Sequence, residues 1–155
     1  MERHFRNIMG DKAEYDLQIN GNYTGIKISA GDALLLKRWD YVTIQQASNY
    51  SFDYETYVPY INEIADYIRT LCPKAKILVH QTWGYETGSE RINKFGFETY
   101  DEMFAKVKES YAKEADEIEA DGIIPCGEVL QAAQKNGMEK VHRDTFHAGS
   151  GAGRF

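Results

Sequence analysis

Tyr41-Val42-Thr43-Ile44-Gln45-Gln46 is the stretch of sequence that decides the fold class. Its aromatic and β-branched residues favour a short buried strand, and it ends in two amides rather than in a turn residue. Ala75-Lys76-Ile77-Leu78-Val79-His80-Gln81 has the same character, and Ile123-Ile124-Pro125 is a shorter version of it. These three stretches predict the strands of one sheet.

Apolar residues recur at helical spacing between and after these strands. The spacing predicts helices over residues 53–71, 99–120 and 127–136. Pro59 falls in the first turn of the first of these helices, where its missing N–H group is tolerated. Strands that alternate with helices are typical of a parallel sheet with helices on both faces. We therefore predict an α/β fold.

Two further expectations concern charged and titratable side chains. The acid-rich helix over residues 99–120 is expected to present its carboxylates to solvent rather than to a metal ion. His142 is expected to be exposed.

The residues before Tyr41 predict smaller elements. A short helix covers residues 2–9 and is closed by Gly10. Asn20-Gly21 lies between two alternating apolar runs and predicts a β-hairpin, because both turn positions need a positive φ. Ser29 then begins a short helix as its N-cap.

The length of 155 residues predicts one domain over residues 1–155, and the composition, with 43% hydrophobic and 27% charged residues, is typical of globular proteins. A net charge of -6 argues against a nucleic-acid partner, since phosphates demand a basic surface. No apolar run has the length of a membrane span, so no membrane partner is expected.

Cysteine and histidine usage predicts no metal site and no cofactor. Cys72 and Cys126 lack metal-ligand spacing and are interpreted as free thiols. The first residues show no signal peptide, so the sequence as written predicts a soluble, cytoplasmic chain.

Polar residues follow the ends of the predicted strands. Gln45-Gln46 ends the first strand, while His80 ends the second and Trp83 follows it closely. Ligands of such sheets bind beyond the carboxyl ends of the strands. Asp144-x-x-His147 lies on a later loop that is expected to return to this edge, and its spacing lets a carboxylate orient an imidazole. His80 is equally consistent with a residue that contacts a ligand and with a histidine at a strand end whose hydrogen bonds are satisfied within the protein. Trp83 is interpreted as part of the wall of the site rather than of the core.

Four segments together resemble a known superfamily over nearly the whole chain. They are residues 39–48, 80–83, 122–125 and 143–147. In this order they are similar to the SGNH (GDSL-like) hydrolases, specifically a bacterial branch catalogued as a domain of unknown function. The resemblance implies a flavodoxin-like three-layer α/β/α fold and the activity of an esterase or deacylase.

The resemblance also implies roles for individual residues. The histidine of the Asp-x-x-His block is the general base in that superfamily, and the aspartate orients it, which implies these roles for His147 and Asp144. Elsewhere in that superfamily an Asn after the third strand helps to bind the oxyanion, and this sequence has Gln45-Gln46-Ala47-Ser48 at that place. Gln46 or Gln45 would supply the donor here, and the sequence does not decide between them.

Several parts of the superfamily pattern do not occur in this sequence. The nucleophilic serine should lie in a Gly-Asp-Ser or Gly-Asn-Ser block after a first strand, and the sequence holds no such block. We expect a chain that lacks one or two N-terminal strands and the last helix of the superfamily. Ser48 and Ser150 are the nearest serines by position, and neither lies on a strand-to-helix turn.

Three expectations about function and partners follow. The first is a serine esterase that acts on a small or glycan ester and is inactive without its nucleophile. The alternative is a non-catalytic glycan-binding or interaction module, which the high aromatic content of 11 Tyr, 7 Phe and 2 Trp also fits. If the strand order of the superfamily applies, residues 41–46 form an open sheet edge, which predicts self-association.

Overall fold

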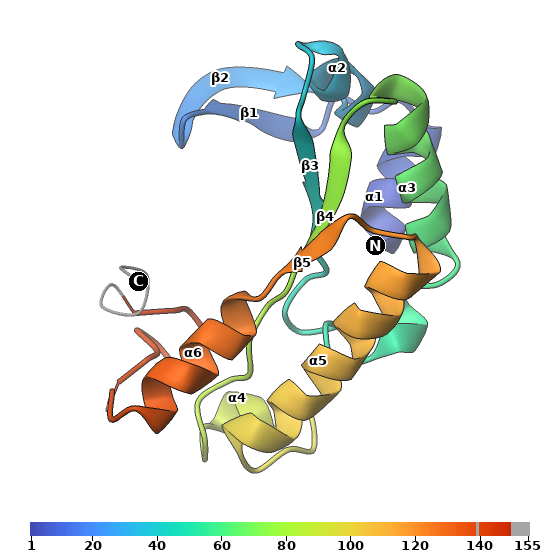
Figure 1. Ribbon diagram of the computed structural model, residues 1–155. Coiled ribbons are helices and arrows are strands. Elements are labelled where there is room, and N and C mark those ends of the chain that lie inside the picture. The colour runs from blue at the N-terminus through green and yellow to red at the C-terminus, as the bar shows by residue number, and fades with distance from the viewer. Residues whose placement is uncertain (139, 150–155) are drawn as a thin grey trace.

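The computed structural model describes residues 1–138 and 140–149 and shows an α/β fold of the flavodoxin-like kind (Figure 1). Three parallel strands form its sheet in the order β3-β4-β5. Their bounds are Tyr41–Ile44 for β3, Lys76–His80 for β4 and Gly122–Ile124 for β5. The predicted fold class and the three predicted strands are confirmed.

Helices connect and cover these strands. They are α1 (Glu2–Met9), α2 (Ala30–Leu35), α3 (Tyr60–Leu71), α4 (Glu90–Asn93), α5 (Tyr100–Glu117) and α6 (Cys126–Lys135), with a 3₁₀ turn at Tyr54–Thr56. In Figure 1, α1, α3 and α5 lie to one side of the sheet, and α6 extends toward the other. A capping box formed by Thr99 and Glu102 begins α5.

The core lies between the sheet and the helices α3 and α5. Apolar side chains at helical spacing on both helices pack against alternate residues of β3 and β4, which point to the same face of the sheet. The buried residues include Ile61, Ile64 and Ile68 of α3, Met103, Val107 and Tyr111 of α5, and Ile44, Ile77 and Val79 of the strands.

The hairpin that Asn20-Gly21 predicts is present. Strands β1 (Tyr15–Ile19) and β2 (Asn22–Ile28) pair antiparallel, and the turn residues Asn20 and Gly21 have φ values of 51° and 78°. All but the last residue of β2 are exposed. The hairpin therefore projects from the body of the molecule (Figure 1).

The first long helix begins later than the sequence predicts. The helix expected from residue 53 is a 3₁₀ turn at Tyr54–Thr56 followed by α3 from Tyr60. Pro59 is the N-cap of α3 rather than a residue of its first turn. A proline disfavours helical φ and ψ in the residue before it, so the helix cannot continue from Val58 into Tyr60.

Two side chains expected in solvent are buried. Glu114 of α5 is 0% exposed and His142 is 3% exposed. Glu114 lies three residues after Tyr111 and four before Ile118, both buried, so helical periodicity places it on the same stripe. His142 is held by a contact of 2.9 Å between its Nε2 and the carbonyl oxygen of Gly84.

None of the helices in the described part of the chain is both long and apolar enough to cross a membrane.

Candidate functional site

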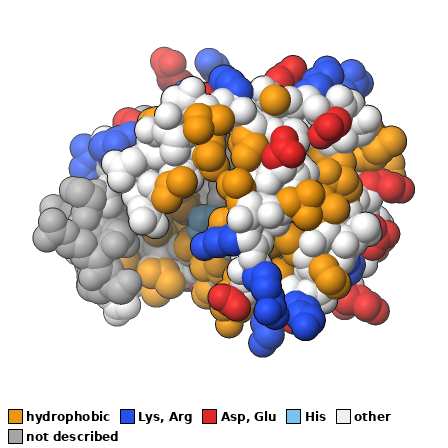
Figure 2. Space-filling model, turned by 90° about the horizontal axis from the view of Figure 1, so that it is seen from above, with side chains coloured by type: hydrophobic (Ala, Val, Ile, Leu, Met, Phe, Trp, Pro, Cys, Tyr) orange, Lys and Arg blue, Asp and Glu red, His pale blue; other side chains and the backbone are white. Residues whose placement is uncertain are grey.

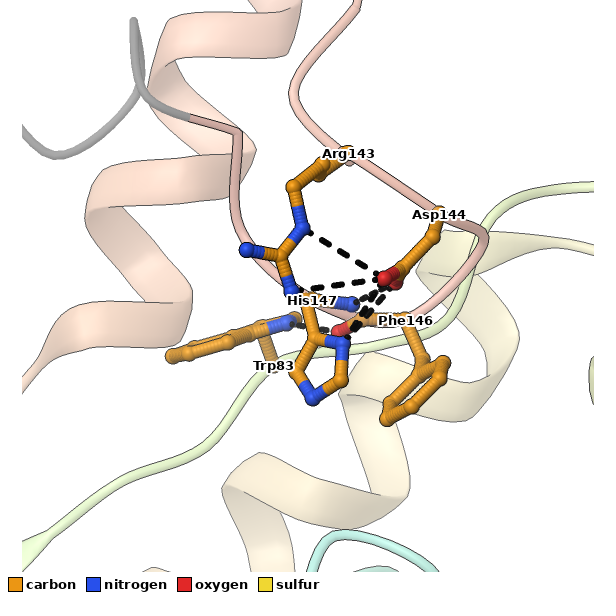
Figure 3. A network of polar contacts seen from close by, with 5 residues as sticks. All are labelled: Trp83, Arg143, Asp144, Phe146 and His147. Atoms are coloured by element: carbon orange, nitrogen blue, oxygen red, sulfur yellow. Dashed lines mark hydrogen bonds and ion pairs between the residues drawn. The ribbon is translucent and has the colours of Figure 1, made fainter.

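Asp144 and His147 form a direct pair on the loop that follows α6 (Figure 3). Both carboxylate oxygens of Asp144 lie 3.0 Å from Nδ1 of His147. One of these oxygens also accepts the backbone N–H of His147 at 3.0 Å. The carboxylate therefore fixes both the position and the orientation of the imidazole ring.

A tight turn brings the two residues together. The N–H of Arg143 donates to the carbonyl oxygen of His147 at 2.8 Å, and the N–H of Phe146 donates to that of Asp144 at 2.8 Å. Thr145 adopts a φ of 64°, in the left-handed region that few non-glycine residues enter. The backbone thus adopts an uncommon conformation where the side chains of Asp144 and His147 converge.

The charge of the pair is set by these contacts. Hydrogen bonds from His147 lower the pKa of Asp144 to about 2, and the guanidinium of Arg143 acts in the same direction. Asp144 is therefore ionised at neutral pH. With Nδ1 facing the carboxylate, Nε2 of His147 has no hydrogen-bond partner among the described residues, and the side chain is 50% exposed. This is the arrangement in which an imidazole accepts a proton from a substrate or nucleophile.

The segment after β4 holds this loop in place. The indole N–H of Trp83 donates to the carbonyl oxygen of Phe146 at 2.7 Å, as Figure 3 shows. The N–H of Glu86 donates to the carbonyl oxygen of Thr145, also at 2.7 Å. Trp83 and the Asp144–His147 pair, which the sequence places in one site, therefore lie together.

Two further residues lie at the site without any indication of this in the sequence pattern. The guanidinium of Arg91 lies 3.9 Å from the ring centroid of Phe146, and the ring of Tyr85 packs edge-on against Phe146 at 5.8 Å. The Phe146 ring in turn lies 3.8 Å from that of His147. Both new residues come from the long segment between β4 and α5, where no periodicity marks the inward side chains.

The two candidate glutamines differ in their surroundings. Gln46 is 2% exposed, and its side-chain N–H group donates to the carbonyl oxygen of Thr56 at 3.1 Å and to its hydroxyl at 3.2 Å. Its side-chain oxygen accepts the N–H of Ala47 at 3.0 Å. Gln45 is exposed, and its side chain makes no hydrogen bond within the described residues. Of the two amides, that of Gln45 is the one available to a ligand.

The remaining candidates have other partners. His80 places Nε2 3.2 Å from Sγ of Cys126, so the end of β4 meets the start of α6. The hydroxyl of Ser48 lies 3.0 Å from that of Tyr85. Neither His80 nor Ser48 makes a polar contact with His147 within residues 1–138 and 140–149, and Ser150 lies outside the described residues.

A hollow lined mainly by polar residues adjoins the loop that carries the pair. Its volume is about 700 Å³, and it is lined by Thr145 together with residues of the segment between β4 and α5, including Glu86, Ser89, Arg91 and Lys94. A hollow of about 780 Å³ lies at the opposite end of the sheet, beside Trp39 and Pro73, where the strands begin. Parallel sheets bind ligands at the carboxyl ends of their strands, which argues against the second hollow as the ligand site.

No cluster of three or more His, Cys, Asp or Glu side chains within the described ranges is arranged to hold a metal ion.

Comparison with known proteins identifies a family and a fold. A family model described as "Domain of unknown function (DUF4886)" matches residues 1–155. A DUF4886 family protein from Bacteroides uniformis has a similar structure, with a TM-score of 0.84 and 26% identity over 96% of this chain and 60% of its own. A protein described as "a putative SGNH hydrolase from Slackia heliotrinireducens" has a TM-score of 0.63 and 22% identity over 77% of this chain and 63% of its own. No curated protein matches.

The structural matches support the fold that the sequence resemblance implies, and they are longer than this chain. The chain spans about three fifths of the length of each of these two proteins.

Proposed function

The chain belongs to the DUF4886 family, and we propose that it is the base-bearing part of an SGNH-type serine esterase or deacylase. The observation that carries the proposal is the Asp144–His147 pair, with Nδ1 held by the carboxylate and Nε2 unoccupied. That geometry is the base half of a serine hydrolase triad.

The chemistry assigned to the pair is proton transfer. Nε2 of His147 takes the proton of a serine hydroxyl as the serine oxygen attacks the carbonyl carbon of an ester. The imidazolium then gives that proton to the departing alcohol, and Asp144 stabilises the positive ring in between. Water hydrolyses the acyl-serine by the same route, which releases the carboxylic acid and restores the serine.

The oxyanion donor that we propose is Gln45. Its amide is exposed and without a partner in the described structure, whereas the amide of Gln46 is taken up by Thr56. An amide N–H can stabilise the negative charge that develops on the carbonyl oxygen. The substrate class is a carboxylic ester, such as an acylated carbohydrate, and no metal or organic cofactor enters this mechanism.

The nucleophile is the part that this sequence does not supply. It contains no Gly-Asp-Ser or Gly-Asn-Ser block, and Ser48 bonds Tyr85 rather than His147. We therefore expect the purified chain to hydrolyse p-nitrophenyl acetate no faster than its His147→Ala variant. Turnover that disappears both with His147→Ala and with one Ser→Ala change would show that a serine of this chain is the nucleophile.

A second experiment tests the esterase assignment itself. The coding sequence ahead of Met1 is the first thing to read, and a strand followed by Gly-Asp-Ser or Gly-Asn-Ser is expected there. A protein that carries this block in front of residues 1–155 should react with a serine-directed fluorophosphonate probe, and labelling should fall sharply in its His147→Ala variant. Absence of labelling in that longer protein would contradict the proposal.

The alternative function, a non-catalytic glycan-binding module, has weaker support because of the contacts of Trp83. A glycan-binding module would use Trp83 as a free aromatic platform, but the indole N–H is already bonded to Phe146 and the ring is part of the loop's support. Saturable glycan binding without turnover, lost on Trp83→Ala, is the result that would favour this module.

A further inference from the structure

Arg91 lies beside the candidate site and has no charged partner there. Its guanidinium carbon is 3.9 Å from the ring centroid of Phe146, and that ring is 3.8 Å from the ring of His147. One aromatic ring therefore separates Arg91 from the imidazole. Arg143 is already paired, with Nη2 3.4 Å from a carboxylate oxygen of Asp144. The side chain of Arg91 makes no hydrogen bond or ion pair within residues 1–138 and 140–149, so its charge is available to a ligand.

Two aromatic rings hold the guanidinium of Arg91 in place. It lies over the ring of Phe146 and 5.9 Å from the ring centroid of Tyr85. The face of an aromatic ring attracts a cation, and this contact uses none of the five N–H donors of an arginine. The position of the charge is thus fixed by packing, while its donors stay free.

The backbone around Arg91 is fixed to the loop that carries the Asp144–His147 pair. Arg91 belongs to α4, and the next residue of that helix, Ile92, is fully buried. The hydroxyl of Ser89 caps the helix by accepting the N–H of Ile92 at 3.3 Å. The bond of 2.7 Å from the N–H of Glu86 to the carbonyl oxygen of Thr145 joins the same segment to the loop. Backbone and side-chain contacts therefore both set the place of Arg91 relative to the imidazole.

Arg91 also lines the hollow of about 700 Å³ that adjoins this loop. Lys94, one helical turn further on, lines it too and is likewise without an ion pair in the described part of the chain. Glu86 and Glu90 are the acids of the lining, so its formal charges balance. A ligand in this hollow is therefore recognised by where the donors of Arg91 lie rather than by a net positive field.

We propose that Arg91 binds a free carboxylate group of the substrate, which lies in this hollow while the ester lies beside His147. The inference rests on the proposed esterase function and adds the class of ester, one that is negatively charged. The planar guanidinium matches the two oxygens of a carboxylate and donates two parallel hydrogen bonds to them. A doubly charged phosphate fits this hollow less well, because Glu86 and Glu90 repel the second charge.

Two aryl acetates, 4-acetoxybenzoate and 4-acetoxybenzamide, form a matched pair of test ligands. They have the same shape, and only the first is charged. One benzene ring separates its carboxylate from its ester, as the ring of Phe146 separates Arg91 from His147. The chain is expected to hydrolyse neither ligand, so binding can be measured at equilibrium.

Nitrogen–proton NMR spectra of the parent chain, titrated with each ligand, test the proposal. The parent should bind 4-acetoxybenzoate about tenfold more tightly than the amide, with shifts in the signals of residues 91 and 143–147. Arg91→Gln should bind the two ligands with equal, weak affinity. Arg91→Lys should lose most of the preference, because it keeps the charge but not the planar fork of donors.

Arg38→Gln is the control with the same change of charge. Arg38 lines the hollow at the other end of the sheet together with Lys37 and Lys74. Lys and Arg side chains gather next to hydrophobic ones at this end of the molecule, which Figure 2 shows from above. Arg38→Gln should keep the full preference for the acid. An equal loss in this variant and in Arg91→Gln would mean that total charge, not Arg91, attracts the ligand.

The proposal would be overturned by a parent chain that binds the acid and the amide equally, or binds neither at millimolar concentrations. A merely structural role of Arg91, in which it only supports Phe146, gives a different result that also overturns it. Arg91→Gln would then bind both ligands more weakly by the same factor and keep their ratio. Fluorophosphonate labelling of the longer protein tests the esterase function separately, so a failure of that function and a failure of this inference are distinguishable.

Discussion

Asp144 and Glu114 are both carboxylates, and the structure gives them opposite states. Asp144 lies on an exposed loop beside His147 and Arg143, and its pKa is lowered to about 2 by the hydrogen bonds from His147. Glu114 belongs to α5 and is fully buried, and neither of its carboxylate oxygens has a hydrogen-bond partner among the described residues. Burial raises its pKa to about 8.

Position in the fold, rather than residue type, therefore determines which of the two acids is charged. Asp144 is ionised at neutral pH because donors surround its charge, and it is thereby suited to orient a base. Glu114 holds a proton at neutral pH because burial disfavours its charge more than the nearby N-terminal ammonium favours it. The carboxyl of Asp144 belongs to the candidate site. The buried carboxyl of Glu114 lowers the stability of the folded protein.

The largest effect is expected at Glu114. The folded carboxyl keeps its proton up to a pH of about 8, whereas in the unfolded chain it loses the proton near its usual value of 4.5. The folded state therefore binds an extra proton between these values, and stability falls as the pH rises through this window. Relative to Glu114→Gln, the free energy of unfolding of the parent should fall by on the order of a few kcal/mol between about pH 5 and about pH 9.

Urea unfolding at several pH values measures this effect. Glu117→Gln is the matched control, because Glu117 lies on the same helix and is exposed. Its pH dependence should follow that of the parent. Equal pH dependence of the parent and Glu114→Gln would mean that Glu114 is not the buried acid described above.

A smaller loss is expected when the support of the loop that carries Asp144 is weakened. Trp83→Phe keeps most of the ring but removes the N–H that donates to Phe146, which should cost about 1 kcal/mol of stability. Amide exchange across residues 143–147 should become faster. Trp39→Phe removes a comparable bond to Ala33, of 3.2 Å, far from this loop and should leave that exchange unchanged. Unchanged exchange in both variants would show that Trp83 does not hold the loop.

The smallest change in stability is expected at Asp144 itself, since the pair is exposed. The effect of Asp144→Ala should appear in the imidazole instead. With the parent in its neutral form, nitrogen NMR of His147 should show one tautomer, with the proton on Nδ1, because Asp144 accepts it there. The variant should show a mixture, and Arg143→Gln should remain like the parent. A mixture already in the parent would contradict the geometry of the pair.

Most of the regular elements could be predicted from local sequence. The hairpin follows from Asn20-Gly21, the start of α5 from the Thr99–Glu102 capping box, and the three strands from short β-branched runs. These signals depend on neighbours within a few residues of the chain. Apolar spacing alone predicts a helix from residue 53, whereas the effect of Pro59 on the residue before it argues for a helix boundary there.

The candidate site was predictable only in part. The Asp144-x-x-His147 spacing indicates a pair, since three residues suffice to close the turn between them. Arg91 and Tyr85 could not be found, because their contacts with Phe146 cross more than fifty residues of chain. The place of Glu114 on the apolar stripe of α5 predicts its burial, whereas its charge predicts exposure.

The sequence by itself therefore determined the order of strands and helices, the turn chemistry and the spacing of the acid–base pair. These depend on interactions between residues close in the chain. Only the tertiary structure shows that Glu114 is buried, and that the side-chain amide of Gln46 is bonded to Thr56 while that of Gln45 has no partner within the described residues. Burial, pairing and charge state are set by whatever the fold places alongside a residue, and that neighbour is usually distant in the sequence.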